Sequence, residues 1–190
     1  MAAPSRHIDT EREGNTMAND QMDGTRTRHD DNFEHLREML RGFRTVMLVT
    51  ETLGGELRSR PLHVAEVRDD LTLVFPTGAD STKVDELSAR PSVHVAAQND
   101  SQWVSLTGVA TVVHDRAEIE RLYDEAWKVW FPNGKDDPDL VLLTVKPSSA
   151  EYWDQAGAKG LRYLASAAKA YVSGDTPSTD HDQHAKVPLA

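Results

Sequence analysis

Two segments near the middle of the chain carry residue types that bind anions. The first is Arg58-Ser59-Arg60-Pro61, which lies in a run with strand-like composition. Because side chains alternate along a strand, Arg58 and Arg60 fall on one face and Ser59 on the other. Two guanidinium groups on one face attract an anion, and each can bind a phosphate through two parallel hydrogen bonds. The alternative is a solvated strand face whose arginines pair with acidic side chains.

The second segment combines hydroxyl groups with a lysine at the expected start of a helix. Phe75-Pro76-Thr77 ends a predicted strand, and Ser81-Thr82-Lys83 opens a predicted helix. The first turn of a helix presents free backbone N–H groups and the positive end of the helix dipole. With the hydroxyls and the ammonium group added, this segment is suited to hold a phosphate. The alternative is ordinary capping, with Ser81 as the N-cap and Lys83 in solvent.

Aromatic side chains are the third candidate feature, because a flat polycyclic ligand needs walls of this kind. The set consists of Trp103, Trp127, Trp130, Phe131, Tyr152 and Trp153. Most aromatic residues of a small protein belong to its core or to an interface, so packing is the alternative for each of them.

Hydrophobic periodicity and turn residues predict the elements that position these side chains. Strands are expected over residues 43–51, 56–67, 71–77, 93–97, 102–114 and 140–152. Helices are expected over residues 32–41, 81–89 and 115–130, with a closing helix over about 161–172. Gly54-Gly55 predicts a hairpin turn, and Gly108 predicts a bulge within a long strand. Six strands joined mostly by tight turns predict a mainly β fold with flanking helices (α+β), an antiparallel sheet rolled into a closed or half-open barrel.

Length and charge set the boundaries of this domain and exclude several functions. The chain has 190 residues and a formal net charge of −10. Residues 1–31 and 173–190 are polar and poor in apolar side chains, which predicts disordered tails around one domain over 32–172. The acidic balance argues against nucleic-acid binding. The absence of cysteine, of a signal-peptide-like start and of a long apolar run predicts a cytoplasmic protein without a membrane span. The scattered histidines do not predict a metal site.

Taken in order, the motifs resemble the general stress protein 26-like branch of the split barrels related to pyridoxamine 5'-phosphate oxidase, which bind FMN. The resemblance covers residues 33–172. It is carried by the segments Phe43–Thr50, Arg58–Leu62, Phe75–Thr77, Asp80–Val84, Val104–Ala110, Asp115-Arg116, Trp130–Pro138 and Glu151–Asp154.

This resemblance implies a homodimer of split barrels with FMN at the subunit interface. It places Arg60 at the flavin-binding arginine of the second strand, with Arg58, Ser59 and Pro61 beside it. It also implies that Phe75 and Thr77 line the edge of the isoalloxazine ring and that Ser81, Thr82 and Lys83 bind the phosphate. Trp103 is implied to contact the flavin from the partner subunit, and Trp153 to reach the cofactor as well. Trp130 and Phe131 are implied to cover the site.

Two departures from the family pattern narrow the expected activity. True pyridoxine-phosphate oxidases carry an Arg-x-His substrate motif soon after the late tryptophan, and no such histidine follows Trp153 closely here. Oxidation of vitamin B6 is therefore not expected. His63-Val64-Ala65 also stands where the family has a lysine, so phosphate binding is expected to be weaker, or FAD to be accommodated.

Four functions remain open at this point. The first is a flavin-dependent oxidoreductase that acts on an unknown small molecule, in which the flavin carries the redox chemistry. The second is a stress protein that binds flavin in order to buffer, sense or store it without turnover. The third is a related split barrel for a deazaflavin or haem, and the fourth is an interaction domain without a cofactor.

Overall fold

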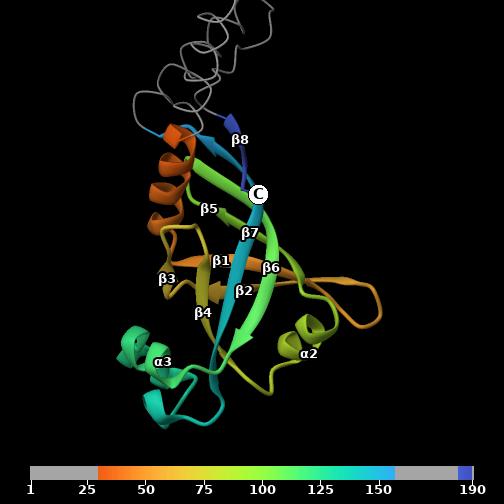
Figure 1. Cartoon of the computed structure of the whole chain (residues 1–190), viewed down its shortest axis with the longest axis vertical. Coiled ribbons are helices and arrows are strands. Elements are labelled where there is room, and N and C mark those ends of the chain that lie inside the picture. Colours follow the sequence, from red (N-terminus) through yellow and green to blue (C-terminus); the bar gives the residue numbers. More distant parts are fainter. Residues whose placement is uncertain (1–29, 157–183, 190) are drawn as a thin grey trace, which may run out of the picture.

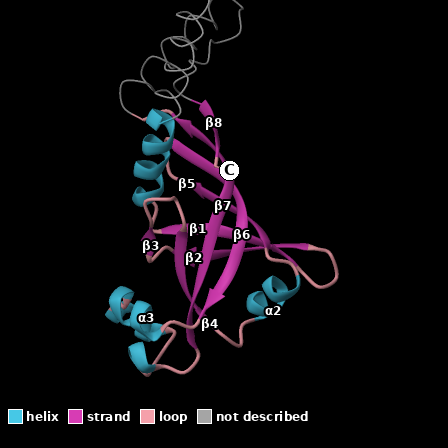
Figure 2. Ribbon diagram, in the orientation of Figure 1, coloured by secondary structure: helices cyan, strands magenta, loops and turns pink. Residues whose placement is uncertain are grey.

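The computed structural model describes residues 30–156 and 184–189. Its centre is one strongly curled antiparallel sheet with helices packed around it (Figures 1 and 2). The strands are β1 (Thr45–Glu51), β2 (Leu57–His63), β3 (Glu66–Val67), β4 (Leu73–Gly78), β5 (Ser92–Gln98), β6 (Gln102–Val113), β7 (Leu140–Asp154) and β8 (His184–Pro188). The helices are an N-terminal helix over residues 30–42, α2 (Thr82–Ala89), α3 (Arg116–Leu122) and the short 3₁₀ helices η1 (Glu125–Val129) and η2 (Gly134–Asp136).

The strand order is β2-β1-β5-β6-β7-β4-β3, and β8 adds to the edge of β7 that β4 leaves uncovered. The predicted hairpin is confirmed: β1 and β2 pair in antiparallel fashion around Gly54-Gly55. The predicted bulge is also confirmed, since the register between β6 and β7 shifts at Gly108. A Cβ at Gly108 would overlap the carbonyl oxygen of Lys146, so only glycine allows the two strands to approach at this point.

The barrel closes where the chain passes from β2 to β3. Val64 donates its backbone N–H to the carbonyl of Arg44 at 2.9 Å, and Ala65 donates to that of Val74 at 2.8 Å. These two bonds link the β1 side of the sheet to the β4 side. Beyond them, β2 and β4 are not hydrogen-bonded neighbours in the described sheet. The barrel is therefore split. Helix α2, which follows β4, lies on the open side, where its residue Glu86 binds Thr50 of β1 and Arg60 of β2.

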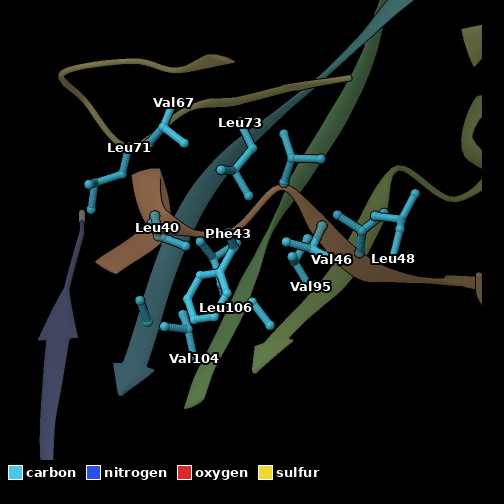
Figure 3. Close-up of a cluster of buried hydrophobic side chains, with 14 of the residues drawn as sticks. Leu40, Phe43, Val46, Leu48, Val67, Leu71, Leu73, Val95, Val104 and Leu106 are labelled. Carbon is cyan, nitrogen blue, oxygen red and sulfur yellow. The ribbon is translucent and has the colours of Figure 1, made fainter. Parts of the chain in front are cut away.

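Two apolar cores divide the interior. The larger one fills the barrel and receives Leu36 and Leu40 from the N-terminal helix; Figure 3 shows Leu40 and Phe43 among barrel side chains such as Leu106. The smaller core lies on the other side of β4 and β7, where Ile119, Trp127 and Phe131 pack on Leu142. Since alternate residues of β4 face different cores, its strand is buried on both faces.

In the described part of the chain the sheet has eight strands rather than the six that we predicted. The predicted strand over 56–67 is interrupted at Val64-Ala65, where the chain crosses between the two edges. The extra strand β8 falls within residues 173–190, which we expected to be disordered. It is stabilised by pairing with β7, from Ser149↔Pro188 to Trp153↔His184, and by the burial of Val187 in the main core. Residues His184 to Val187 alternate polar and apolar side chains, but so short a run does not identify the strand with which it pairs.

The predicted helix over 115–130 is also wrong in its middle. It breaks after Leu122, and Asp124 starts η1 by accepting a hydrogen bond from the Ala126 N–H at 2.8 Å. The break lets Ile119 and Trp127 face the same core from two separate segments. The closing helix predicted over about 161–172 lies outside the described residues. No helix in the described part of the chain is long and apolar enough to span a bilayer.

Candidate functional site

The open side of the barrel gathers the polar residues that the sequence singled out. We call Arg58, Arg60, Thr77, Ser81 and Lys83 the cradle. In β2, Arg58 and Arg60 lie opposite Thr50 and Leu48 of β1, so they point to the inner side of the sheet. Thr77 shares the inner face of β4 with Phe75, whose side chain belongs to the main core. Ser81 and Lys83 lie at the start of α2, which follows β4 after a short loop.

Both cradle arginines bind the same buried carboxylate, Glu86 of α2. Arg60 Nη2 donates to Glu86 Oε2 at 2.8 Å, and Arg58 Nη1 donates to Oε1 at 3.1 Å. The Glu86 side chain is only 2% exposed, whereas that of Arg60 is 19% and that of Arg58 is 51% exposed. The alternative that these arginines pair with acidic side chains is therefore correct in part. Pairing is incomplete, however, because Arg60 Nη1 is buried without a hydrogen-bond partner in the described chain.

Lys83 carries a second cation into the same region. Burial of its ammonium group lowers its pKa, and the nearby positive charge of Arg60 lowers that pKa further; Asp139, Asp80 and Glu86 oppose the shift without cancelling it. Lys83 Nζ donates to Ser81 Oγ at 2.8 Å and has no carboxylate within ion-pair distance among the described residues. Ser81 occupies the N-cap position of α2 without making the side-chain capping bond, so ordinary capping does not account for its hydroxyl.

The loop between β4 and α2 is held by the start of β7. Ala79 donates its N–H to the Asp139 carbonyl at 2.8 Å, and Asp80 donates its N–H to Asp139 Oδ1 at 3.1 Å. A Cβ at Gly78 would lie 2.5 Å from Asp139 Oδ2, so glycine permits this close approach. Thr77 Oγ1, next to this loop, is buried without a hydrogen-bond partner in the described chain. The cradle therefore presents two buried polar atoms that a ligand could satisfy.

Other predicted site residues lie on the outer face of the sheet, away from the cradle side chains. Ser59 and Pro61 are exposed on the opposite face of β2. Trp103 and Trp153 face each other across β6 and β7 and are half-buried. The Trp153 ring stacks on His184 of β8, with ring centroids 4.9 Å apart and planes 7° from parallel.

The structure separates the remaining predicted contacts. Phe131 is buried in the smaller core and Trp130 is 66% exposed beside it. Thr82 is exposed at the start of α2. Within one chain, then, the cradle brings together the cations and hydroxyls, with Phe75 on the same face of β4, but the tryptophans and Phe131 lie elsewhere.

Comparison of the chain with known proteins identifies its family. A protein-family model described as pyridoxamine 5'-phosphate oxidase like matches residues 31–178, which is most of the chain. The chain belongs to this family. Among curated relatives, the Neurospora crassa protein bli-3 is 27% identical over 119 residues, which cover 57% of each protein. General stress protein 26 of Bacillus subtilis is 30% identical over 84 residues, 42% of this chain and 59% of that protein. The chain thus spans less than two thirds of these relatives.

Solved structures of the family share the fold. A candidate general stress protein 26 from Jannaschia sp. CCS1 superposes with a TM-score of 0.67 at 25% identity, covering 84% of this chain and 99% of that one. The general stress FMN/FAD binding protein of Xanthomonas citri gives 0.52 at 26% identity, with 60% and 82% covered. An FMN binding protein from Nostoc punctiforme, related to pyridoxamine 5'-phosphate oxidase, gives 0.54 at 19% identity, with 68% and 83% covered, and supports the fold alone. The predicted split barrel is confirmed.

Sequence reasoning missed the residues that organise the cradle of this family member. Glu86 was not singled out, because a glutamate three positions after Lys83 is normally a solvated helix residue. Thr50 and Asp139 lie 36 and 59 residues away from the groups they bind, Glu86 and Asp80. The one available signal is that Glu86 directly precedes the apolar Leu87, which is buried in the structure.

Proposed function

We propose that the cradle binds the phosphate of a flavin, FMN or alternatively FAD. The observation that carries this proposal is the buried and unpaired Arg60 Nη1. A buried donor without a partner is destabilising, and a phosphate oxygen would satisfy it with a charge-assisted bond. Thr77 Oγ1 offers a second contact. The lowered pKa of Lys83, which reflects its burial and then the charge of Arg60, points the same way, because a nearby anion would raise that pKa again.

In this proposal Arg60, Ser81 and Lys83 hold the phosphate, and Thr82 adds a backbone N–H from the first turn of α2. Arg58, more exposed, lies at the rim and adds positive charge. The phosphate of FMN carries a charge near −2. The three cations Arg58, Arg60 and Lys83, less the negative charge of Glu86, leave a net charge of about +2 to match it. These contacts fix one end of the flavin and leave its ring to be placed by other groups.

A second copy of the chain would supply the aromatic surface that a single cradle lacks. Trp103 and Trp153 lie on the outer face of the sheet, as do Ser59 and Pro61. Met47 and Val109 are exposed apolar residues of the same sheet. Apolar side chains of this kind are favoured at the centre of subunit interfaces. A homodimer that brings these residues of one copy to the cradle of the other would enclose the ring.

The proposed activity is that of a flavin-dependent oxidoreductase on a small molecule. When bound, the flavin would supply the electron transfer, and the residues of the chain would bind and orient it. The name of the Xanthomonas citri relative, an FMN/FAD binding protein, supports the cofactor. Vitamin B6 is not the proposed substrate, because the Arg-x-His motif is absent after Trp153.

The first test is the absorption spectrum and a flavin titration of the purified protein. We expect a yellow protein with the two absorption bands of a flavin, FMN binding with one flavin per chain, and a dimer by light scattering. A colourless protein that binds neither FMN nor FAD would overturn the proposal. A Soret band would instead identify a haem protein.

A second measurement separates the enzyme from a protein that only stores or senses flavin. The bound flavin is mixed anaerobically with NADPH or NADH, and its absorbance is followed. Bleaching is expected for the oxidoreductase. A flavin that stays oxidised with both donors would favour the storage or sensing function over catalysis.

A further inference from the structure

Glu86 is a carboxylate buried inside a site that we propose to be specific for anions. It lies in the middle of α2, and its side chain is 2% exposed next to the core residue Leu87. Burying a carboxylate without partners is strongly unfavourable. Replacing a whole buried ion pair by apolar residues of similar volume often leaves stability unchanged, so packing of α2 alone does not require a carboxylate here. The presence of an ionised group therefore needs an explanation beyond packing.

The two oxygens of Glu86 have divided contacts. Oε2 accepts a hydrogen bond from Thr50 Oγ1 at 2.6 Å and one from Arg60 Nη2 at 2.8 Å. Oε1 accepts from Arg58 Nη1 at 3.1 Å. Burial alone would raise the pKa of Glu86, but the bonds from Thr50 and Arg60 and the charges of both arginines outweigh it and lower that pKa below its ordinary value. Glu86 is thus ionised at neutral pH.

This arrangement determines which donors remain for a ligand. Thr50 belongs to β1 and fixes Oε2 on the barrel side, so the guanidinium of Arg60 is held through Nη2. Its Nη1 is left buried and unpaired. A free arginine side chain would lose several rotatable bonds on binding a phosphate, and orienting it beforehand removes that entropic penalty.

We propose that Glu86 is the positioning residue of the cradle: it holds Arg60 so that Nη1 is available to a phosphate, and it thereby sets the preference for FMN over riboflavin. The inference rests on the proposed function, since it concerns the same site. If the inference is correct, Glu86 affects the binding only of flavins that carry a phosphate group. A residue that only anchors α2 would affect every flavin equally.

The test compares the affinities of FMN and riboflavin in the wild-type protein and in Glu86→Gln. Glutamine has the same shape and can still accept a hydrogen bond from Thr50, but it cannot pair with two guanidinium groups. We expect FMN binding to weaken about tenfold or more, as for the loss of a charged hydrogen-bond partner, while riboflavin affinity changes by less than about twofold. The affinities are measured by quenching of flavin fluorescence, and thermal unfolding confirms that the variant is folded.

The matched control is Glu66→Gln, because Glu66 also binds two arginines, Arg68 and Arg121, but on the α3 side of the barrel. It is expected to leave both flavin affinities unchanged. If Glu86→Gln does not fold, Thr50→Val replaces it, since this change removes one bond to Glu86 without altering charge. Thr50→Val is expected to weaken FMN binding about two- to fivefold, again with riboflavin unaffected.

Three results would contradict the inference. An unchanged ratio of FMN to riboflavin affinity in a folded variant would show that Glu86 only anchors α2. Tighter FMN binding in Glu86→Gln would show that Glu86 competes with the phosphate. A wild-type protein that binds riboflavin as well as FMN would overturn the phosphate site itself, and hence the proposed function, whereas the first two results leave that function standing.

Discussion

Two groups of arginines on this barrel have similar composition but a different balance of contacts. In the cradle, Arg58 and Arg60 share the single buried carboxylate of Glu86. On the α3 side, Arg68 and Arg121 share two carboxylates, and we call this group, completed by Glu66 and Glu118, the α3 ion cluster. Arg121 binds both oxygens of Glu66, at 2.8 and 2.9 Å.

The two groups differ in whether an arginine nitrogen is left without a hydrogen-bond partner. Arg121 is 54% exposed and pairs with both Glu66 and Glu118, and none of its nitrogens is buried without a hydrogen-bond partner in the described chain. Arg60 is 19% exposed, and one of its nitrogens has no partner in the described chain. An exposed and balanced ion cluster contributes little to stability and offers nothing to a ligand. A buried cation with a free donor is unfavourable until an anion binds, which is the property expected of a binding site.

The largest expected effect is the loss of flavin affinity on truncation of the cradle arginine. Arg60→Ala removes the donor assigned to the phosphate, so FMN affinity should fall by about 1–3 kcal/mol, or 5- to 150-fold. Isothermal titration calorimetry with FMN measures the change. Arg121→Ala is the matched control and should bind FMN like the wild type. Equal losses in both variants would show that general charge, and not the cradle, attracts the flavin.

A smaller effect on affinity, with no loss of stability, is expected for Lys83→Met. Burial, and then the charge of Arg60, lowers the pKa of Lys83 in the folded protein. The unfolded chain therefore holds this proton more tightly, and the charged lysine opposes folding at all pH values below its folded-state pKa. Methionine keeps most of the apolar stem without the charge. FMN affinity should fall about tenfold while the flavin-free protein melts at the same or a higher temperature.

A melting temperature clearly below that of the wild type would contradict this. It would mean that Lys83 stabilises the folded protein in the absence of a ligand. The comparison is made by thermal unfolding of both proteins without flavin, followed by FMN titration of each.

The third expected effect is that the stability contributed by Glu86 depends on pH. The pKa of Glu86 is lowered in the folded state: burial opposes this shift, but the bonds from Thr50 and Arg60 outweigh it. A lowered carboxyl pKa stabilises the fold above the unfolded value of about 4.5 and loses that contribution as pH falls through the folded value. The stability advantage of the wild type over Glu86→Gln, about 1 kcal/mol at pH 7, should therefore shrink towards pH 3. Urea unfolding at several pH values measures it; an advantage that stays constant with pH would refute the assignment.

The smallest effect concerns the α3 ion cluster. Arg121→Ala should reduce the free energy of unfolding by about 0.2–1 kcal/mol, and added salt should diminish the difference, because the pair is exposed. Urea unfolding at low and high salt tests this. A loss larger than that of Glu86→Gln at neutral pH would reverse the contrast drawn between the two groups.

Much of the barrel was predictable because its signals are local. Gly54-Gly55 marks a hairpin, and alternation places Arg58 and Arg60 on one face; both follow from neighbouring residues. The motif order from Arg58 to Trp153 pointed to the family, which the comparisons confirm. The role of each cradle residue towards a flavin stays a prediction.

What could not be predicted depends on contacts between distant segments. Glu86 is buried only because Thr50, Arg58 and Arg60 converge on it from the β1–β2 hairpin, and no pattern within α2 announces this. The break at Asp124 required knowledge that Ile119 and Trp127 share a core. The pairing of β8 with β7 joins segments far apart in the sequence, and the short alternation within β8 does not identify its partner strand.

The edge of β7 has a consequence for how the protein opens. One edge of this strand is covered in two parts, by β4 over Leu140–Val145 and by β8 over Ser149–Trp153. Between them, Lys146, Pro147 and Ser148 pair with neither strand. Detachment of the five residues of β8 would uncover its half of the edge while the half under β4 remains bonded. Amide hydrogens of β7 that face β8 should then exchange with deuterium through a small local opening, and those that face β4 only when the barrel itself unfolds.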